Sequence, residues 1–522
     1  MVAKVYSAAV LGVDAYEVEV EVDAAHGLPS FNVVGLPDAA VKESRDRVKT
    51  AILNSGLEFP SNKRLTANLA PADTRKEGPA FDLPLALGVL LSLGLLDAGR
   101  LAEACFSGEL SLDGSLRPVR GALPMAVEAR RKGRRTLVLP AANAAEAAVV
   151  EGLQVLGAES LAQVVAWLQG EIELPQAQVD LEQALSAPGQ GEVDFCDVKG
   201  QAHVKRALEV AAAGGHNLLM IGPPGSGKSL LARCLPGILP SLSLEESIEV
   251  TKVHSVAGLL APGQALVPAR PFRLPHHTIS HAGLIGGGSN PRPGEVSLAH
   301  HGLLFLDELP EFGKSVLEVL RQPLEDGRVT ISRAAGSLTY PARCMLAAAM
   351  NPCPCGHLGD TRKPCLCTPK QVALYLARLS GPLLDRIDIH IEVPSLAFED
   401  MAASEGAEPS AAVRQRVQAA RRVQEQRFSS GAARRPRQAH CNAQMGPRAI
   451  KAHCKLGKEG VSMLRAAVER LGLSARAYDR ILKVARTIAD LEHSEAIGVA
   501  HLSEAIQYRT LDRRGRAAPS AS

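Results

Sequence analysis

Short apolar runs and amphipathic segments alternate along this chain, and the pattern predicts the strands and helices of an α/β protein. Residues 1–22 alternate apolar and polar positions, as a half-buried strand does. The runs 218–221, 302–306 and 344–350 are almost wholly apolar, which is typical of strands covered on both faces. Between 473 and 491 the apolar residues recur every three or four positions, which indicates an amphipathic helix.

The longest apolar run, 83–96, predicts a core segment and not a membrane span. It falls short of the about 20 residues that a membrane helix needs, and it contains Pro84, Gly88 and Gly94. The N-terminus lacks the order of apolar core and small-residue cleavage site that marks a signal peptide. We therefore expect a cytoplasmic protein that makes no contact with a membrane.

Length and charge predict the domain organisation. A chain of 522 residues predicts about three domains, and 46% hydrophobic with 22% charged residues excludes wholesale disorder. Seven acids and no Lys or Arg lie in 171–197, so we expect a first domain over 1–170 and an acidic linker over 171–193. The net charge of the whole chain is only +3, but one segment is strongly basic: residues 411–448 contain nine arginines and a single acid. That segment is either a solvated helix face or a contact for a polyanion.

A phosphate-binding motif follows the first of the three apolar runs. Residues 222–229 satisfy G-x-x-x-x-G-K-[ST], in which glycines let backbone N–H groups approach phosphates and the next helix directs its positive end at them. Lys228 would reach the β- and γ-phosphates, and the Ser229 hydroxyl would bind Mg²⁺. The motif predicts an ATP site formed by Gly222, Pro223, Pro224, Gly225, Ser226, Gly227, Lys228 and Ser229.

Polar side chains also end the other two apolar runs. Asp307 and Glu308 follow the second run, and Asn351 follows the third. Asp307 would hold Mg²⁺ through water, and Glu308 would polarise the attacking water as the general base. Asn351 would orient that water, because strand ends of an α/β sheet meet at the nucleotide. Together with the P-loop, these residues predict an ATPase.

The three strand ends and the segment 194–201 resemble the AAA+ ATPases, in particular their magnesium-chelatase-like branch. Over essentially the whole chain, the sequence is similar to the ComM/YifB family of bacterial competence proteins. This resemblance implies a P-loop AAA+ domain over 194–395, then an Arg-rich segment and a helical C-terminal lid over 396–510. The remaining tail, 511–522, we expect to be disordered.

The same resemblance implies roles for two arginines. Arg386, within the sequence Leu-Leu-Asp-Arg-Ile-Asp, would complete the ATP site of the neighbouring subunit as an arginine finger. Arg476 would be the second sensor of the lid, with Arg480 as the other choice. Shared sites imply a closed homo-oligomeric ring, which we expect to be a hexamer.

Two further segments distinguish this branch. The Pro- and Gly-rich residues 261–301 predict a projecting loop, which the resemblance identifies as the helix-two insert. His276, His277 and His281 in it lack a regularly spaced fourth ligand and are interpreted as loop residues. Alternation over 329–340 predicts a hairpin with Arg333 beside its tip. In related ring motors this hairpin enters the pore, so the resemblance implies that Arg333 contacts a phosphate backbone; the alternative is an ordinary surface hairpin.

Four of the ten cysteines form two C-x-C pairs just after Asn351. Four thiolates can close a tetrahedral Zn²⁺ site, but the usual spacing is C-x₂-C, which lets backbone N–H groups surround the sulfurs. The pattern therefore leaves a zinc site and free thiols as equal alternatives. The four residues are Cys353, Cys355, Cys365 and Cys367.

The first domain resembles the proteolytic domain of Lon, which has a ribosomal-protein-like α/β fold. Ala80 stands after Gly-Pro where Lon-type proteases carry the nucleophilic serine, and Pro124 stands where they carry the catalytic lysine. Without a hydroxyl or an amine at these positions the domain cannot perform that proteolysis. We interpret it as an interaction or ring-forming module.

The resemblance implies ATP-driven DNA translocation with helicase activity, namely branch migration of recombination intermediates during natural transformation. With 3% aromatic residues, binding of single- or double-stranded DNA and branched junctions should run through phosphates and ignore sequence. The alternatives are a magnesium-chelatase-type chaperone and a protein-remodelling ATPase. The fold alone does not separate these classes.

Overall fold

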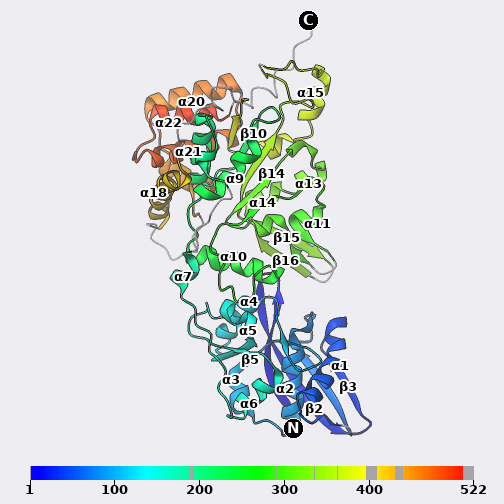
Figure 1. Cartoon of the computed structure of the whole chain (residues 1–522). Helices are drawn as coiled ribbons and strands as arrows, with labels where there is room; N and C mark the ends of the chain where they lie inside the picture. The colour runs from blue at the N-terminus through cyan, green and yellow to red at the C-terminus, as the bar shows by residue number, and fades with distance from the viewer. Residues whose placement is uncertain are drawn as a thin grey trace.

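The computed structural model describes residues 2–60, 62–186, 193–288, 291–333, 336–360, 362–395, 408–429 and 439–509. Figure 1 shows two sheets in succession, one in the N-terminal part of the chain and one in the part that follows residue 193. Within the described residues, none of the helices combines the length and the apolarity that crossing a membrane would require.

Among the described residues, the N-terminal sheet has seven strands, in the order β3-β4-β2-β1-β5-β8-β9. The N-terminal alternation predicted strand structure, and the residues form two strands, β1 and β2, which pair antiparallel, with Val18, Val20 and Val22 buried and the intervening glutamates on the other face. The strands are β1 (Ala3–Leu11), β2 (Asp14–His26), β3 (Ser30–Val34), β4 (Lys63–Ala70), β5 (Ala104–Phe106), β8 (Thr136–Pro140) and β9 (Gln154–Ala158).

The longest apolar run forms helix α2, which is buried along most of its length and packs on β1 and β2. A methyl group at Gly88 would lie 2.6 Å from Cγ2 of Val22, so the absence of a side chain there lets the helix approach the sheet. The run is therefore a core helix. The helices of this part are α1 (Ala39–Asn54), α2 (Asp82–Ser92), α3 (Ala98–Glu103), α4 (Ala122–Arg131), α5 (Ala141–Ala147) and α6 (Leu161–Leu168), and β6 (Glu109–Leu110) pairs with β7 (Leu116–Arg117).

The acidic stretch contains one short helix, α7 (Leu181–Leu185), within its described residues. Helix α10 (Leu244–Ala257) of the second part packs on α4, and Leu123, Val149 and Leu266 form a small apolar cluster between them. The buried Glu146 carboxylate accepts hydrogen bonds there from the Leu123 N–H and from the Ser255 hydroxyl. The two parts of the chain therefore share a packed contact.

In the part of the chain that the structure describes, the second sheet has five strands, all parallel, in the order β11-β14-β17-β10-β18. The three apolar runs of the sequence form its central strands, and all their residues are buried. Successive residues enter opposite cores, since Leu218 and Met220 pack on one face while Leu219 and Ile221 pack on the other. The strands are β10 (Leu218–Ile221), β11 (Phe272–Arg273), β14 (Leu303–Leu306), β17 (Met345–Met350) and β18 (Ile389–Glu392).

Helices cover both faces of this sheet, and the amphipathic helix predicted near the end of the chain is α21. The helices before residue 396 are α8 (Ala202–Gly214), α9 (Lys228–Ile238), α11 (His281–Ile285), α12 (Glu295–Leu298), α13 (Lys314–Glu318), α14 (Arg321–Asp326), α15 (Pro369–Leu376) and α16 (Gly381–Leu384). The later ones are α18 (Ser410–Ser429), α19 (Pro447–His453), α20 (Lys458–Leu471), α21 (Ala475–Leu491) and α22 (Val499–Gln507).

The segment 261–301 differs from the projecting loop that its composition predicted. It contributes the edge strand β11, the helices α11 and α12 and the small strand pair β12 (Gly286–Gly287) and β13 (Arg292–Pro293). Leu284 and Val296 are buried in the core on one face of the sheet. Elements of two to five residues carry no detectable periodicity, so composition alone gave the wrong expectation.

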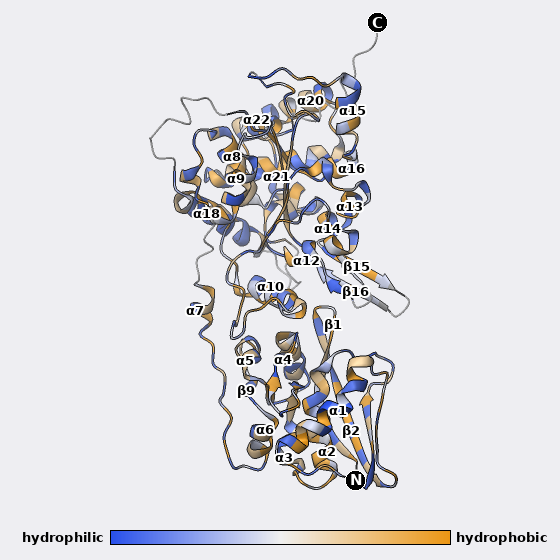
Figure 2. Ribbon diagram, turned by 45° about the vertical axis from the view of Figure 1, so that its right-hand side comes forward, coloured by the Kyte–Doolittle hydropathy of each residue, from blue (hydrophilic) through white to orange (hydrophobic). Residues whose placement is uncertain are grey.

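The predicted hairpin is confirmed as the antiparallel pair β15 (Arg328–Arg333) and β16 (Gly336–Pro341). Figure 2 shows it projecting from the helices around it, beside the end of β1. A methyl group at Gly12, in the turn between β1 and β2, would lie 3.7 Å from the Thr339 carbonyl oxygen. The backbone of Arg333 ends β15, and the side chain of Arg333 lies outside the described part of the structure.

Candidate nucleotide site

The P-loop lies between β10 and α9, as the motif predicted. The loop needs two of its glycines for left-handed backbone, because Gly225 has φ +74° and Gly227 has φ +87°. At Gly222, a methyl group would lie 2.1 Å from the carbonyl oxygen of Val393, the residue that directly follows β18. Helix α9 starts at Lys228, so its N-terminal N–H groups and positive dipole end adjoin the loop.

The Lys228 ammonium is held over this loop. Its Nζ atom donates 2.8 Å hydrogen bonds to the carbonyl oxygens of Gly222 and Pro223, and it lies 3.3 Å from Oδ1 of Asn351. Burial lowers the pKa of Lys228, and the nearby carboxylates Asp307 and Glu308 act in the opposite direction. The side chain therefore presents a cation where the P-loop would receive phosphates.

Ser229 and Asp307 meet at the same end of the sheet. The Ser229 hydroxyl donates a 2.6 Å hydrogen bond to Oδ2 of Asp307, while Oδ1 of Asp307 accepts one from the Glu308 N–H at 2.9 Å. A hydroxyl and a carboxylate are oxygen ligands of the kind that Mg²⁺ prefers. The three strand ends thus gather the side chains that the sequence assigned to ATP and Mg²⁺.

Glu308 has an uncommon backbone conformation, with φ +52° and ψ +47°. A non-glycine residue in the left-handed region costs about 1–3 kcal/mol and often marks a functional site. The Glu308 side chain is 59% exposed, and one of its oxygens lies 3.6 Å from Nδ1 of His277. Sequence reasoning interpreted His277 as a loop residue; its place beside Glu308 makes it a further candidate for this site.

Arg386, the expected arginine finger, and Arg476, the expected second sensor of the lid, lie together, away from the P-loop. Arg386, Arg476 and Arg480 line a common cleft of about 530 Å³, and no P-loop residue is among its described lining residues. Arg386 is buried, donates a 2.8 Å hydrogen bond to the Pro382 carbonyl oxygen and pairs with Glu325. This grouping puts both arginines on a different surface from the chain's own ATP site.

Arg480 and Arg476 differ in their contacts. Arg480 pairs with the buried Asp388 and donates to the Arg386 carbonyl oxygen at 3.1 Å, whereas Arg476 is exposed. Burial alone would raise the pKa of Asp388, but the Arg480 charge and a hydrogen bond with His216 hold that pKa well below its usual value. Arg480 is therefore committed to the fold, and Arg476 stays the predicted sensor.

A group of buried histidines escaped the sequence reasoning. Nε2 of His300 lies 3.0 Å from Oε2 of Glu249, and Nε2 of His301 lies 2.9 Å from the same oxygen, both within hydrogen-bond distance. Nδ1 of His300 accepts the Arg343 N–H at 3.0 Å, so the ring proton sits on Nε2 and is donated to Glu249. A proton at that nitrogen leaves no lone pair for a metal, so the group stabilises the core.

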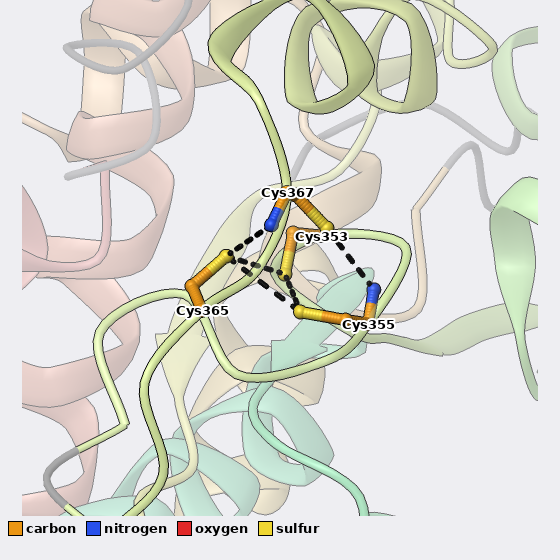
Figure 3. A group of neighbouring side chains, drawn as sticks. All are labelled: Cys353, Cys355, Cys365 and Cys367. Carbon is orange, nitrogen blue, oxygen red and sulfur yellow. Dashed lines mark hydrogen bonds between the residues drawn. The ribbon is translucent and has the colours of Figure 1, made fainter.

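The four cysteines converge in the loop that follows Asn351, as Figure 3 shows.

In the N-terminal part, the backbone carbonyl of Ala80 accepts a 2.9 Å hydrogen bond from the Gly108 N–H, and Pro124 is buried in α4. Lys76, the lysine near Ala80, is buried and donates to the Thr74 carbonyl oxygen at 2.8 Å. Neither Lon-like position provides a nucleophile or a base.

Comparisons with known proteins fit this geometry. The family model of magnesium chelatase subunit ChlI matches residues 194–401, the model of its C-terminal part matches 407–509, and a further ChlI model matches 20–143. The chain is 45% identical over 513 residues to the competence protein ComM of Haemophilus influenzae, with 98% of each chain covered. It is 45% identical over 515 residues to the uncharacterized protein YifB of Escherichia coli, covering 98% of this chain and 97% of the relative.

The comparisons confirm the predicted fold class, an α/β AAA+ core preceded by a Lon-like domain. They also agree with an ATP-dependent protein, since the matching family is one of AAA+ ATPases. The likeness to ComM and YifB extends over nearly the whole of each chain. This chain therefore belongs to the ComM/YifB family of magnesium-chelatase-like AAA+ proteins.

Proposed function

We propose that this chain is an ATP-driven AAA+ ring motor that acts on DNA, and that it drives branch migration of recombination intermediates during natural transformation. The observation that carries the proposal is the assembled site, in which Ser229 contacts Asp307 while Lys228 lies beside Asn351. One relative is named as a competence protein, which supports a role in DNA uptake or recombination.

ATP and Mg²⁺ are the proposed cofactors. The backbone N–H groups of the P-loop and the Lys228 ammonium would bind the phosphates, and Ser229 and Asp307 would hold Mg²⁺, which neutralises phosphate charge when bound. Glu308 would accept a proton from the attacking water, and Asn351 would orient that water. The exposed position of the Glu308 carboxylate supports this role, because a general base must reach a solvent-derived nucleophile.

A ring, which we propose to be a hexamer, would bring the arginine cleft to a neighbour's ATP. Arg386 and Arg476 line one cleft without any contribution from their own P-loop to its described lining. Arginine stabilises charge on a transferring phosphoryl group only when it lies beside that group. Their place therefore supports a role at the ATP site of the next subunit.

The DNA contact is assigned to the β15–β16 hairpin and not to α18. Three arginines of α18 bind the chain itself: Arg416 pairs with Glu209 and Glu408, Arg421 donates to the Ala212 carbonyl oxygen, and Arg427 pairs with Asp490. The Arg-rich residues 430–438 lie outside the described part. Arg333, at the end of β15, is the proposed phosphate contact.

A magnesium-chelatase-type chaperone is the second candidate. It is favoured by the family models, which are named after the magnesium chelatase subunit ChlI and match both 194–401 and 407–509. A chelatase-type or protein-remodelling ATPase would hydrolyse ATP without responding to DNA. DNA dependence therefore separates the candidates.

The decisive experiment measures ATP hydrolysis and movement of a synthetic three-way junction with the purified full chain. We expect DNA of unrelated sequences to stimulate ATPase activity, and we expect ATP to drive strand exchange. Affinity for DNA should fall with salt in proportion to the phosphates contacted. An ATP-hydrolysing protein that ignores DNA would contradict the motor proposal and favour the chaperone.

The hairpin contact is tested by Arg333→Ala, with Arg328→Ala as the matched control. Arg328 is exposed on the same strand at the end opposite to Arg333. Loss of the tip arginine should remove strand exchange but leave basal ATPase activity, because the hairpin is not part of the nucleotide site. Equal effects of the two substitutions would argue against a contact specific to the tip.

A further inference from the structure

The loop between β17 and α15, residues 351–368, joins Asn351 to the rest of the chain without an apolar core of its own. In its described residues, Leu358 is 40% exposed and Leu366 is 85% exposed, whereas Cys353 is fully buried. A loop of this length that buries Cys353, leaves its other three cysteines half-buried and exposes its leucines must be held by something other than hydrophobic packing.

The four cysteine sulfurs of this loop lie at mutual distances that suit one metal ion. Sγ of Cys353 is 3.4 Å from Sγ of Cys355 and 3.6 Å from Sγ of Cys365, and the latter two are 3.6 Å apart (Figure 3). All four sulfurs, including that of Cys367, lie within 4.8 Å of one another. Zinc–sulfur bonds of about 2.3 Å place tetrahedral sulfurs about 3.8 Å apart.

The fold also supplies the N–H donors whose absence weakened the sequence argument. The Cys355 N–H donates to Sγ of Cys367 at 3.4 Å, and the Cys367 N–H donates to Sγ of Cys365 at 3.4 Å. Both bonds end on sulfurs of the second pair, one from the facing pair and one from within the pair itself, so the folded loop brings N–H groups to these sulfurs despite the C-x-C spacing. Such N–H groups stabilise the negative charge of thiolates bound to a metal.

We propose that Cys353, Cys355, Cys365 and Cys367 bind one structural Zn²⁺ ion, which fixes Asn351 and the P-loop relative to each other. Four protein thiolates fill all tetrahedral positions, so the ion has no open position for a substrate or a reactive water. It would stabilise the loop and take no part in the reaction. Binding requires that the four thiols lose their protons to solvent.

The connection to the ATP site is short. Cys353 lies two residues after Asn351, whose side chain reaches Lys228 at 3.3 Å. Gly356, with φ +84°, lies against the P-loop, where a methyl group would be 2.5 Å from Cδ of Pro224. The loop 351–368 thus contacts the ATP site at two points, through Asn351 and through Gly356. Any effect of the zinc ion on hydrolysis rests on the ATPase function proposed above.

The first test measures metal in the full chain without any nucleotide. We expect about one zinc per chain by mass spectrometry, and after its removal, Co²⁺ should give the intense visible bands of a tetrahedral tetrathiolate site. Cys365→Ser with Cys367→Ser should lose the metal, whereas Cys196→Ser, a change at an exposed cysteine outside the cluster, should keep it. Because Co²⁺ is added to the unaltered chain, the test does not depend on the folding of a variant.

A chain whose four thiols are reduced and titratable, but which takes up neither Zn²⁺ nor Co²⁺, would overturn the proposal. So would metal that persists in the double serine variant. These results do not depend on ATP hydrolysis, and an inactive protein that still binds one zinc would contradict the proposed function and leave the zinc site supported.

The second test asks whether the zinc acts through Asn351. Removing the metal should lower kcat by about tenfold or more, as misplacement of a positioned group does, with a smaller change in KM. Asn351→Ala should lower kcat similarly, and zinc removal from that variant should add little, because both changes disturb one unit. Additive effects would show that zinc does not act through Asn351, and an unchanged kcat would overturn the positioning role.

Discussion

The Ser229 hydroxyl donates a 2.6 Å hydrogen bond to Oδ2 of Asp307, so the residue after the P-loop lysine meets the end of β14 directly. The two residues are far apart in the sequence: Ser229 lies at the start of α9, after β10, and Asp307 directly follows β14, and these two strands lie on either side of β17 in the sheet. Their contact shows that the first turn of α9 reaches across the intervening strand to the end of β14. It also defines the position where Mg²⁺ would bridge protein and phosphate.

Binding and hydrolysis of ATP should separate in two variants of this site. Lys228→Ala removes the cation from the P-loop and should raise the Kd for ATP by about 10- to 100-fold, the cost of a charged hydrogen bond. Glu308→Gln removes the base but keeps the shape of the side chain. The variant should therefore bind ATP normally, and its kcat should be lower by about 100-fold or more. Titration with a fluorescent ATP analogue and steady-state ATPase assays measure the two effects. Hydrolysis by Glu308→Gln at the unaltered rate would contradict the assignment of the base.

The packing of α2 on the N-terminal sheet gives a prediction for stability. Gly88→Ala places a methyl group 2.6 Å from Cγ2 of Val22, which should destabilise the fold by about 1–3 kcal/mol through overpacking. Gly99→Ala in α3 meets no atom within 4 Å and is the matched control. Thermal unfolding should show a lower Tm for the first variant alone. Shortening Val22 to alanine in the Gly88→Ala background should recover part of the loss, and the absence of any recovery would contradict this cause.

The sequence predicted the central sheet and its site for a clear physical reason. Strands buried on both faces are apolar at every position, as 218–221 and 303–306 are, and the carboxyl ends of parallel strands meet at one edge. Polar residues directly after such runs, such as Asp307 and Asn351, therefore had to lie near the P-loop. The hairpin 328–341 was predictable because alternation and a turn are local features.

Other parts of the site depend on contacts that no local pattern records. His277 reaches Glu308 only through the folding of the segment 261–301, whose short elements have no periodicity. Family resemblance predicted roles for Arg386 and Arg476, but their common cleft exists only because the fold brings Arg386, which follows α16, close to Arg476 of α21. The hydrogen bond from the Cys355 N–H to Sγ of Cys367 likewise depends on how the two C-x-C pairs face each other.

The stability of the chain should fall in mild acid because of His300. Burial and the charge of neighbouring His301 lower the pKa of His300 to about 4, against about 6.5 in an unfolded chain. Between these values only the unfolded state binds the proton, so the free energy of unfolding decreases as the pH falls from about 6.5 to about 4, by about 3 kcal/mol at most. His300→Gln, which keeps an N–H donor for Glu249, should flatten this pH dependence. Urea denaturation at several pH values measures it, and an unchanged slope would rule out His300 as its source.

The last prediction concerns the arginine cleft. Arg386→Ala and Lys228→Ala chains should each have little ATPase activity alone, but mixed rings should recover part of it. In a mixed ring, an intact P-loop of one chain meets an intact Arg386 of the next at about a quarter of the interfaces. Each of the two chains carries a different affinity tag, and rings recovered after purification on both tags in turn contain both chains. Mixing Lys228→Ala with Glu308→Gln is the matched control, because both residues serve the ATP site of their own chain and no interface becomes complete. Recovery in the first mixture alone supports a finger that acts on the neighbour, whereas no recovery in verified mixed rings would place Arg386 outside catalysis and leave its pairing with Glu325 as a structural contact.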